Sequence, residues 1–378
     1  MSKWETVRLG DVLEYEQPTK YIVESTDYED SYETPVLTAG QTFILGYTDE
    51  TENIFTDFPV IIFDDFTTAI KYVDFPFKVK SSAMKILKPT KKGNIKYLFY
   101  YMSTIKTDTQ LHKRYWISKY SNIEIPLPPL ETQQKIADVL DRAGALIKKR
   151  KAQIEKLDLL IKSQFIEMFG DPVTNPKIWT KQKIKNISEG GKYSIKGGPF
   201  GSVLKKEYYT NRGYKIYGQE QVINGDPNYG DYYISETKFK ELESCAVKTG
   251  DILISLVGTY GKLLIIPEKH QAGIINPRLM KISLNQSLVI PTYFKYYFVS
   301  QAMISVMEEI SRGGTMDILN VGHIKDLEIP IPPLFLQTKF VDFVNQIETQ
   351  KSLLQQSLEK LELNYKSLMQ KCFRGEIF

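Results

Sequence analysis

Side chains that could perform chemistry are few and scattered in this chain. The three histidines, His112, His270 and His323, show none of the spacings with which side chains share a metal ion. Asp64-Asp65 follows an apolar run and could bind a catalytic cation, but no matching carboxylate and lysine stand near it, and a turn after a strand is the simpler interpretation. We therefore predict neither a catalytic residue nor a metal ligand.

Two segments share part of a known motif. Asn175-Pro176-Lys177-Ile178 begins like the Asn-Pro-Pro-aromatic element of amino-methyltransferases, but it lacks the second proline and the aromatic ring. Gly197-Gly198-Pro199-Phe200-Gly201-Ser202 is rich in glycine, but it has neither the Lys-Ser/Thr ending of a phosphate-binding loop nor the spacing of a dinucleotide-binding fingerprint. We interpret the first as a turn, and the second as a turn or a loop whose backbone approaches DNA.

Charge is distributed unevenly along the first third of the chain, although the formal net charge of the whole is only +4. Acidic residues predominate up to Asp65, and basic residues predominate from Lys71 to Lys119. Such segregation can place a basic face on one side of a domain, where it would neutralise phosphates, or it can belong to a solvated surface on which the charges alternate in space. Both interpretations remain open, and we favour the basic face.

Candidate DNA contacts follow from residue type and from position near glycine-marked loops. Base edges bond with Arg, Lys, Asn, Gln, Ser and Thr, whereas phosphates accept from lysine, arginine, hydroxyl and backbone N–H groups. For each candidate, a role in the surface or in the fold is an equal alternative. In the first half of the chain the candidates are Lys20, Tyr21, Thr38, Gln41, Thr67, Thr68, Lys71, Lys80, Ser81, Ser82, Arg114 and Tyr115. In the second half they are Lys196, Ser202, Lys205, Gln219, Thr259, Tyr260, Lys262, Asn276, Arg278, Arg312 and Thr315.

The elements that must position these residues are encoded twice. The segment Ile123–Leu130, Ile-Glu-Ile-Pro-Leu-Pro-Pro-Leu, returns at Leu327–Leu334 as Leu-Glu-Ile-Pro-Ile-Pro-Pro-Leu. The spacing between the copies then stays constant, so that Gln133 corresponds to Gln337. The period is far longer than that of solenoid repeats, which indicates duplication of a whole module of domain and linker.

A long helix is predicted after each proline run. Apolar residues recur there in alternating steps of four and three, the seam of a coiled coil, and Gly170 and Gly375 supply helix stops. We expect the two helices to pack on each other, because their seams match in length and neither helix shows a second apolar face. The alternative is that each helix packs only on its own domain. The predicted seam consists of Ile136, Leu140, Ile147, Ile154, Leu157 and Ile161 in the first helix, and of Phe340, Val344, Ile347, Leu354, Leu358, Leu361, Tyr365 and Leu368 in the second.

The two globular bodies combine strands with helices. Strand-like runs such as Pro59–Phe63, Asp251–Leu256 and Leu263–Ile266 are bounded by Gly, Pro or Asp, and a helical segment precedes each proline run, at Asn94–Met102 and at Tyr293–Glu309. We therefore predict the α/β (α+β) class, with two bodies in tandem and their helices in an antiparallel coiled coil of pseudo-twofold symmetry. The expected domains are residues 1–130, a helix at 131–171, residues 172–334, and a helix at 335–378.

Composition indicates a cytoplasmic protein. No apolar run is long enough to span a bilayer, and the first residues, Met1-Ser2-Lys3-Trp4-Glu5, do not open a signal peptide. The two cysteines, Cys245 and Cys372, cannot form a disulfide framework, as expected in a reducing compartment.

Taken together, these features resemble the specificity subunit of a type I restriction-modification system. In that family a target-recognition domain, a Leu-Pro-Pro-Leu run with a following Gln, and a long helix occur twice. The Gln usually follows Glu there, whereas Gln133 and Gln337 follow Thr132 and Leu336. Further similar segments are Gly170-Asp171-Pro172, Asn175–Trp179, Gly250–Ser255, Gly258-Thr259-Tyr260-Gly261, Asn276-Pro277-Arg278 and Gly313-Gly314-Thr315.

The resemblance implies a non-catalytic subunit that reads a bipartite, asymmetric target in double-stranded DNA. Two recognition domains would be held apart by the helices, which would dock two modification (methyltransferase) subunits and, in a system that also restricts, two restriction subunits. S-adenosylmethionine would then belong to the modification subunit, and ATP and Mg to the restriction subunit, with no cofactor in this chain and no membrane partner. Leu130, Leu334 and Phe335 could anchor a partner helix or pack under their own domains.

Two alternatives belong to other classes of protein. A free-standing sequence-specific DNA-binding protein would bind its duplex tightly without a partner. A coiled-coil protein-interaction scaffold would show no salt-dependent affinity for DNA.

Overall fold

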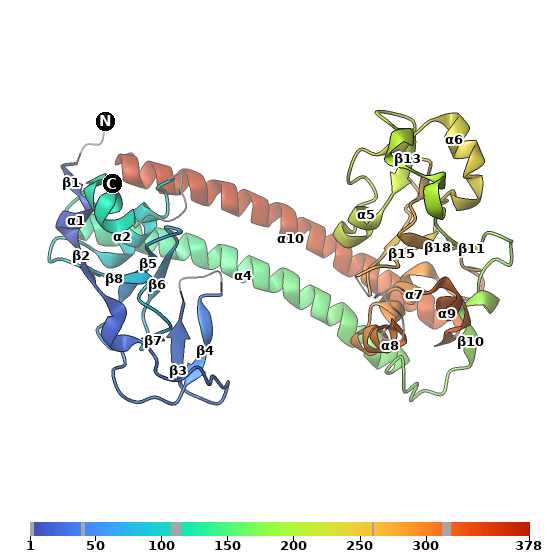
Figure 1. The fold of residues 1–378 in the computed structure, drawn as a ribbon, viewed down its shortest axis with the longest axis horizontal. Helices are drawn as coiled ribbons and strands as arrows, with labels where there is room; N and C mark the ends of the chain where they lie inside the picture. Colours follow the sequence, from blue (N-terminus) through green and yellow to red (C-terminus); the bar gives the residue numbers. More distant parts are fainter. Residues whose placement is uncertain (1–3, 39–41, 107–114, 259–260, 312–318) are drawn as a thin grey trace. The chain divides into compact units, whose positions relative to one another are not determined.

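The computed structural model describes residues 4–38, 42–106, 115–258, 261–311 and 319–378, except for the side chains of Ser202 and Ser311. The chain divides into two compact units (Figure 1). Unit 1 comprises Met1–Ala152 and Gln355–Phe378, and unit 2 comprises Gln153–Leu354. Because α4 spans Leu130–Phe169 and α10 spans Leu334–Arg374, each long helix contributes one half to each unit.

Unit 1 contains two sheets and a two-stranded ribbon. The larger, antiparallel sheet has the order β2 (Leu13–Glu16), β8 (Met84–Pro89), β5 (Val60–Asp64), β6 (Ile70–Val73). The smaller sheet has the order β4 (Ile44–Thr48), β3 (Thr34–Leu37), β7 (Lys78–Val79), and β3 and β7 run parallel. The ribbon pairs β1 (Thr6–Arg8) with β9 (Glu124–Pro126). Since β5 is apolar from Val60 to Phe63 and buried along its length, it lies at the centre of the body.

Short helices complete unit 1: α1 (Leu9–Val12), α2 (Ile95–Met102), α3 (Tyr115–Ser118) and the 3-10 turns η1 (Pro18–Tyr21) and η2 (Tyr120–Asn122). The start of α2 is determined locally, because the Asn94 side chain accepts from the backbone N–H groups of Lys96 and Tyr97.

Unit 2 repeats this topology. Its first sheet has the order β11 (Ile195–Gly197), β18 (Leu279–Ile282), β15 (Ile252–Ser255), β16 (Leu263–Ile265). Its second has the order β12 (Tyr209–Thr210), β14 (Tyr233–Ile234), β13 (Tyr214–Tyr217), β17 (Gly273–Ile275), and β13 and β17 run parallel. The ribbon pairs β10 (Lys181–Lys183) with β19 (Glu328–Pro330). The central antiparallel sheet and the parallel pair thus recur in two bodies whose sequences differ.

The helices of unit 2 are α5 (Gln219–Asn224), α6 (Glu236–Glu241), α7 (Pro291–Phe298), α8 (Gln301–Ser311) and α9 (Val321–Asp326). The helical segment predicted over Tyr293–Glu309 is present, and it consists of two helices, α7 and α8. Ser300 separates the two: its hydroxyl donates to the Tyr297 carbonyl at 2.8 Å and accepts from the Met303 N–H at 3.3 Å, which caps α8.

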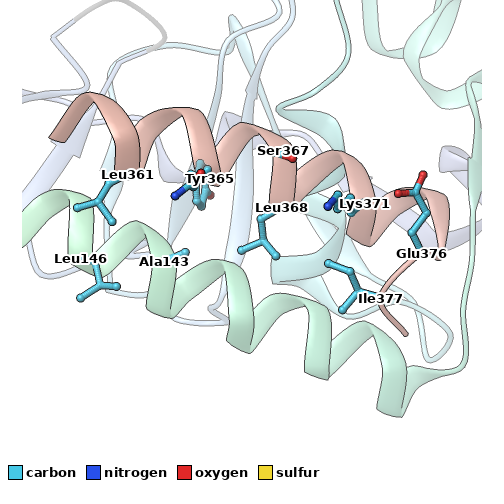
Figure 2. Close-up of a pocket in the computed structure, with 10 residues that line it drawn as sticks. Ala143, Leu146, Leu361, Tyr365, Ser367, Leu368, Lys371, Glu376 and Ile377 are labelled. Carbon is cyan, nitrogen blue, oxygen red and sulfur yellow. The ribbon is translucent and has the colours of Figure 1, made fainter. Parts of the chain in front are cut away.

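In unit 1 the two long helices pack antiparallel. Gly144 of α4 lies near Tyr365 of α10, and Lys151 pairs with Glu362 at 2.8 Å, so residue numbers rise along one helix as they fall along the other. The two helices and the C-terminal residues border a shallow pocket of about 530 Å³ that Leu368 and Ile377 line (Figure 2).

In unit 2 the other halves of the helices also pack on each other. The rings of Phe165 and Phe169 on α4 each lie with their centroids 5.5 Å from that of Phe340 on α10. The Tyr293 ring of α7 stacks on Phe165, which brings the globular body into the same core. Since α4 leaves the core of unit 1 and ends in the core of unit 2, the alternative in which each helix packs only on its own domain is wrong.

The predicted seam residues are buried or half-buried throughout. The fully buried ones are Ile136, Leu140, Ile161, Phe340, Val344, Ile347 and Leu358. Outside the seam, Leu146 and Leu363 are 54% and 68% exposed, and Leu160 and Leu353 are exposed as well. Heptad counting missed these residues because it records the seam positions alone.

None of the helices in the described part of the chain combines the length and the apolar character needed to cross a membrane.

Candidate nucleic-acid interface

Three loops meet at one edge of unit 2, where β13, β15 and β17 end. The Asn276 N–H donates to the Tyr217 carbonyl at 2.8 Å, which joins the loops after β17 and β13. The Leu256 N–H donates to the Arg278 carbonyl at 2.9 Å, which joins the loops after β15 and β17. We call residues 217–219, 255–258 and 276–278 the three-loop cluster of unit 2.

Unit 1 has the equivalent cluster, formed by residues 37–38, 64–68 and 80–83. The Lys80 N–H donates to the Leu37 carbonyl at 2.9 Å, and the Asp65 N–H donates to the Ala83 carbonyl at 3.3 Å. The topology is responsible, because β3 and β7 are parallel neighbours whose carboxyl ends lie at the same edge. Each body therefore presents three loops together, with different residues on them.

A groove of about 920 Å³ adjoins the three-loop cluster of unit 2. Its polar lining includes the predicted residues Gln219, Asn276 and Arg278, and Tyr209 and Tyr232 supply aromatic faces. Amide, guanidinium and aromatic groups in one hollow can bond with base edges and stack on bases.

Glycine allows two loops to approach each other closely beside this groove. A Cβ added to Gly198 would lie 1.9 Å from the Asn276 carbonyl oxygen, and one added to Gly218 would lie 2.8 Å from the Asn276 side-chain nitrogen. The glycine-rich segment after Ile195 thus lies against the loop that carries Asn276 and Arg278.

The structure brings together only part of the predicted set in unit 2. Gln219, Asn276 and Arg278 lie in the cluster. Lys196 lies on β11 with its ammonium 5.8 Å from the Tyr193 ring, and exposed Lys205 pairs with Glu207 at 3.6 Å. Lys262 is exposed just before β16. Thr259, Tyr260, Arg312, Thr315 and the Ser202 side chain lie outside the described residues.

In unit 1 the predicted residues of the cluster are Thr38, Thr67, Thr68, Lys80, Ser81 and Ser82. Lys80 and Ser82 are exposed, whereas the Thr67 hydroxyl donates to the Asp64 carboxylate. Thr68 adopts a φ of 63° in this turn. Exposed Lys80 is therefore the strongest candidate in this unit for a phosphate contact.

Other predicted residues of unit 1 lie away from the cluster or inside the core. Lys20 pairs with Glu16 at 3.0 Å, and Lys71 lies 5.8 Å from the Phe43 ring. Tyr21 and Tyr115 are only 9% and 4% exposed, which leaves their rings a packing role. Gln41 and Arg114 lie outside the described residues.

In the first third of the chain, part of the basic stretch forms ion pairs with the acidic stretch that precedes it. Several lysines of the basic stretch pair with acids that precede them in sequence, so they contribute less to an open basic face than the sequence suggests. These pairs are Lys78 with Glu50, Lys85 with Asp65, and Lys88 with Glu16 and Asp57.

The carboxylates of Asp64 and Asp65 form hydrogen bonds within the fold. Asp64 accepts from the N–H groups of Phe66 and Thr67, and Asp65 accepts from the Trp116 N–H at 2.8 Å. Among the described residues, which exclude His112, no group of three or more His, Cys, Asp or Glu side chains is arranged to hold a metal ion.

Other polar residues of the groove were missed by sequence reasoning. They are Lys206, Thr210, Asn211, Glu220 and Asp231. Lys206 could have been found, since it directly follows Lys205 in a loop. Glu220 could also have been found, since it follows Gln219 on α5. Thr210, Asn211 and Asp231 come into the groove through the pairing of β12 with β14, which no local pattern marks.

A globular body, a proline run and a long helix follow one another in the chain, and this series occurs twice. It defines a class of proteins in which two domains of one topology are each followed by a long helix. The chain belongs to the family of type I restriction modification DNA specificity domains, whose model matches residues 1–156 and again residues 176–363. The resemblance seen in the sequence is thereby confirmed, as is the α+β class with two tandem domains, each followed by a long helix. The family is that of the specificity subunit, which is not the catalytic one.

Curated relatives and solved structures agree with this family. The chain is 31% identical to the Type I restriction enzyme EcoR124I/EcoR124II specificity subunit of Escherichia coli, over 96% of this chain and 91% of the relative. It is 23% identical to the MjaVIII specificity subunit of Methanocaldococcus jannaschii, over 99% and 93%. The fold is similar to that of the crystallised S subunit of a type I restriction-modification system from M. genitalium, with a TM-score of 0.59 at 14% identity over 98% of this chain and 96% of the other.

Proposed function

We propose that this chain reads a two-part, asymmetric target in double-stranded DNA, with one half-site for each unit. The observation that carries the proposal is the recurrence of the three-loop cluster with different residues. Lys80-Ser81-Ser82 occupies the loop after β7, where Asn276-Pro277-Arg278 occupies the loop after β17. Two scaffolds of one topology with unlike loops suit the reading of two unlike sequences.

The long helices would act as a spacer that sets the gap between half-sites. A helix of 40 residues is about 60 Å long at 1.5 Å per residue. Packing of α4 on α10 in both units would resist bending of this spacer. Half-sites about one turn of DNA apart, roughly 34 Å, are compatible with helices of that length.

Partner subunits would supply the chemistry. We propose two modification subunits that transfer methyl groups from S-adenosylmethionine to adenine, and restriction subunits that use ATP and Mg, in the cytoplasm. Leu353 and Leu363 on α10, and Phe335 at its start, are 62%, 68% and 60% exposed and offer apolar contacts for such partners. This chain itself would need no cofactor.

The test is to co-express the chain with an adenine-methyltransferase subunit and to map the methylated adenines across the host genome. We expect two short specific elements separated by a gap of constant length. Replacing residues 172–334 with the second body of another specificity subunit should change one element and leave the other. A contiguous motif, or a motif that the exchange leaves unchanged, would refute the two-reader proposal.

The same material tests the rival classes. A free-standing DNA-binding protein would bind the motif equally well without the methyltransferase subunit. A protein scaffold would show no salt-dependent affinity for DNA, whereas phosphate contacts give an affinity that falls steeply as salt rises.

A further inference from the structure

Arg278 lies in the groove of unit 2, and both its backbone N–H and its backbone carbonyl are hydrogen-bonded. Its N–H donates to the Asn276 side-chain oxygen at 2.9 Å, and its carbonyl accepts from the Leu256 N–H at 2.9 Å. Gly198 lies against the Asn276 carbonyl so closely that a Cβ there would have no room. The Cα of Arg278 is therefore held in place relative to the three loops.

The guanidinium of Arg278 is oriented by Gln219. One of its terminal nitrogens donates to the Gln219 side-chain oxygen at 3.3 Å. The amide nitrogen of Gln219 donates in turn to the Ser255 hydroxyl at 2.8 Å and to the Val257 carbonyl at 2.6 Å. Because both amide hydrogens of Gln219 have acceptors, its oxygen is directed at Arg278, which leaves the other N–H donors of the guanidinium for a ligand.

Arg278 is exposed in a groove that the carboxylates of Glu220 and Asp231 also line. No carboxylate among the described residues forms an ion pair with Arg278, and its side chain is exposed at the groove. A cation needs no fixed orientation to bind a phosphate, because that attraction depends chiefly on charge and distance. A guanidinium held at one nitrogen presents its remaining donors in a set direction, which suits a planar partner with two neighbouring acceptors.

We propose that Arg278, positioned by Gln219, reads a guanine in the half-site that unit 2 recognises. In the major groove guanine presents O6 and N7 side by side, and arginine bonds with both at once. The inference rests on the proposed function and adds one specified base to it.

The position of unit 1 that corresponds to Arg278 carries no guanidinium group. Both units carry a Met-Lys-Ile segment in the strand next to the central one, at Met84 in β8 and at Met280 in β18. Counting back two residues from each Met aligns Ser82 with Arg278. A guanine read in this way belongs to the half-site of unit 2 alone.

The experiment uses the whole chain in complex with its methyltransferase subunit, and a plasmid library in which the half-site of unit 2 is randomised. Wild-type complex should methylate members with guanine at one position of that half-site in preference to the others. Arg278→Gln should reduce this preference by about tenfold or more, and the half-site of unit 1 should stay as it was. Gln219→Ala should weaken the same preference by less.

Two further variants keep the test decisive. Arg212→Gln removes an exposed arginine from the turn before β13, outside the groove lining, and should leave the motif unchanged. Arg278→Lys keeps the charge but lacks the planar fork, so it should keep the salt dependence of methylation and only part of the guanine preference, because an ammonium can also donate to O6 and N7. Unfolding temperatures of the Arg278 and Arg212 variants should match the wild type, since both side chains are exposed.

Three results would overturn the inference. One is a wild-type motif without guanine in the half-site of unit 2. Another is an equal fall in methylation on every library member in Arg278→Gln, which is the behaviour of a phosphate contact. The third is a guanine preference that Arg278→Gln retains at full strength. By contrast, a wild-type complex with no two-part motif would refute the proposed function itself.

Discussion

Gln133 and Gln337 make the same three hydrogen bonds in the two units. The Gln133 side-chain oxygen accepts from the Asn94 N–H at 2.7 Å, and its amide nitrogen donates to the carbonyls of Lys92 and Pro128 at 3.0 and 2.8 Å. Gln337 accepts from the Ile290 N–H at 2.9 Å and donates to the carbonyls of Leu288 and Pro332 at 3.0 and 2.9 Å. Each glutamine, fully buried, thus joins the start of a long helix to the proline run and to the loop before α2 or α7.

Replacing either glutamine with leucine should destabilise one unit and spare the other. Gln133→Leu leaves the Asn94 N–H and two carbonyls without partners in a buried site, at a cost of about 3 kcal/mol in the free energy of unfolding. Hydrogen exchange should show faster opening in unit 1 for Gln133→Leu and in unit 2 for Gln337→Leu. Gln134→Leu, on the exposed face next to Gln133, is the control and should cost less than about 1 kcal/mol.

The two phenylalanines at the start of α10 should separate folding from partner binding. Phe340 is fully buried against Phe165 and Phe169, so Phe340→Ala should cost about 3–5 kcal/mol of stability. Phe335 is 60% exposed, so Phe335→Ala should change stability by less than about 0.5 kcal/mol. If Phe335 anchors a modification subunit, pull-down of that subunit should weaken in Phe335→Ala. Equal capture by Phe335→Ala and by wild type would exclude the anchor.

Features with local or periodic causes could be predicted from the sequence. The duplication and the seams are visible as repeated residues at set spacings, and burial of seam residues such as Leu140 and Phe340 follows from that periodicity. The first helical segment, predicted over Asn94–Met102, matches α2, and the Asn94 side chain caps this helix. The repeat of Gln133 as Gln337 is visible in the sequence, but the hydrogen bonds of these side chains are not, because the carbonyls they reach belong to loops that only the fold brings near.

The candidate interface could be predicted only in part, since it is made by loops far apart in the chain. Gln219 and Arg278 were chosen by residue type, yet their contact depends on the parallel pairing of β13 and β17. Residue type also misled, because the hydroxyl groups of Tyr21 and Tyr115 could bond with phosphates, whereas both residues belong to the core in the fold. Charge counting overestimated the basic face of unit 1, because lysines such as Lys78 find partners among the preceding acids.

A methyl group at Gly198 should disturb the groove of unit 2. Gly198→Ala places a Cβ 1.9 Å from the Asn276 carbonyl oxygen, so the backbone must shift, at a cost of about 1–3 kcal/mol. Gly191→Ala is the matched control, because a Cβ there meets nothing within 4 Å and its φ lies outside the left-handed range. We expect a lower unfolding temperature and weaker specific methylation in Gly198→Ala, and neither in Gly191→Ala. Similar behaviour of the two variants would contradict the close packing described for this loop.

Lys80 should contribute to DNA affinity without contributing to specificity. It is exposed at the three-loop cluster of unit 1, where the loss of one phosphate contact would weaken binding equally on all sequences. In Lys80→Gln, the slope of log K against log salt should fall by about 1 for the complex with its methyltransferase subunit. Lys91→Gln removes an exposed lysine from the turn before α2, outside the cluster, and should leave the slope unchanged. Equal slopes for wild type and Lys80→Gln would exclude this contact.

Acid should destabilise unit 1 through Glu16. Burial raises the pKa of this carboxyl group, but hydrogen bonds and charge from Lys88, Tyr21 and Lys20 outweigh it and lower the pKa to about 2. A carboxyl group whose pKa falls on folding stabilises the fold above its ordinary pKa of 4.5, and this stabilisation is lost as the pH falls from about 4.5 through about 2. Thermal unfolding between these pH values should therefore show a falling unfolding temperature for unit 1.

Glu16→Gln should be less stable than wild type at neutral pH and should lose less of its stability on acidification. Its amide cannot carry the charge that Lys20 and Lys88 pair with, so the proton uptake linked to unfolding is removed. Glu14→Gln, at an exposed position of the same strand β2, is the control and should follow the wild-type curve. A Glu16→Gln protein with the acid sensitivity of wild type would show that other carboxylates cause the loss.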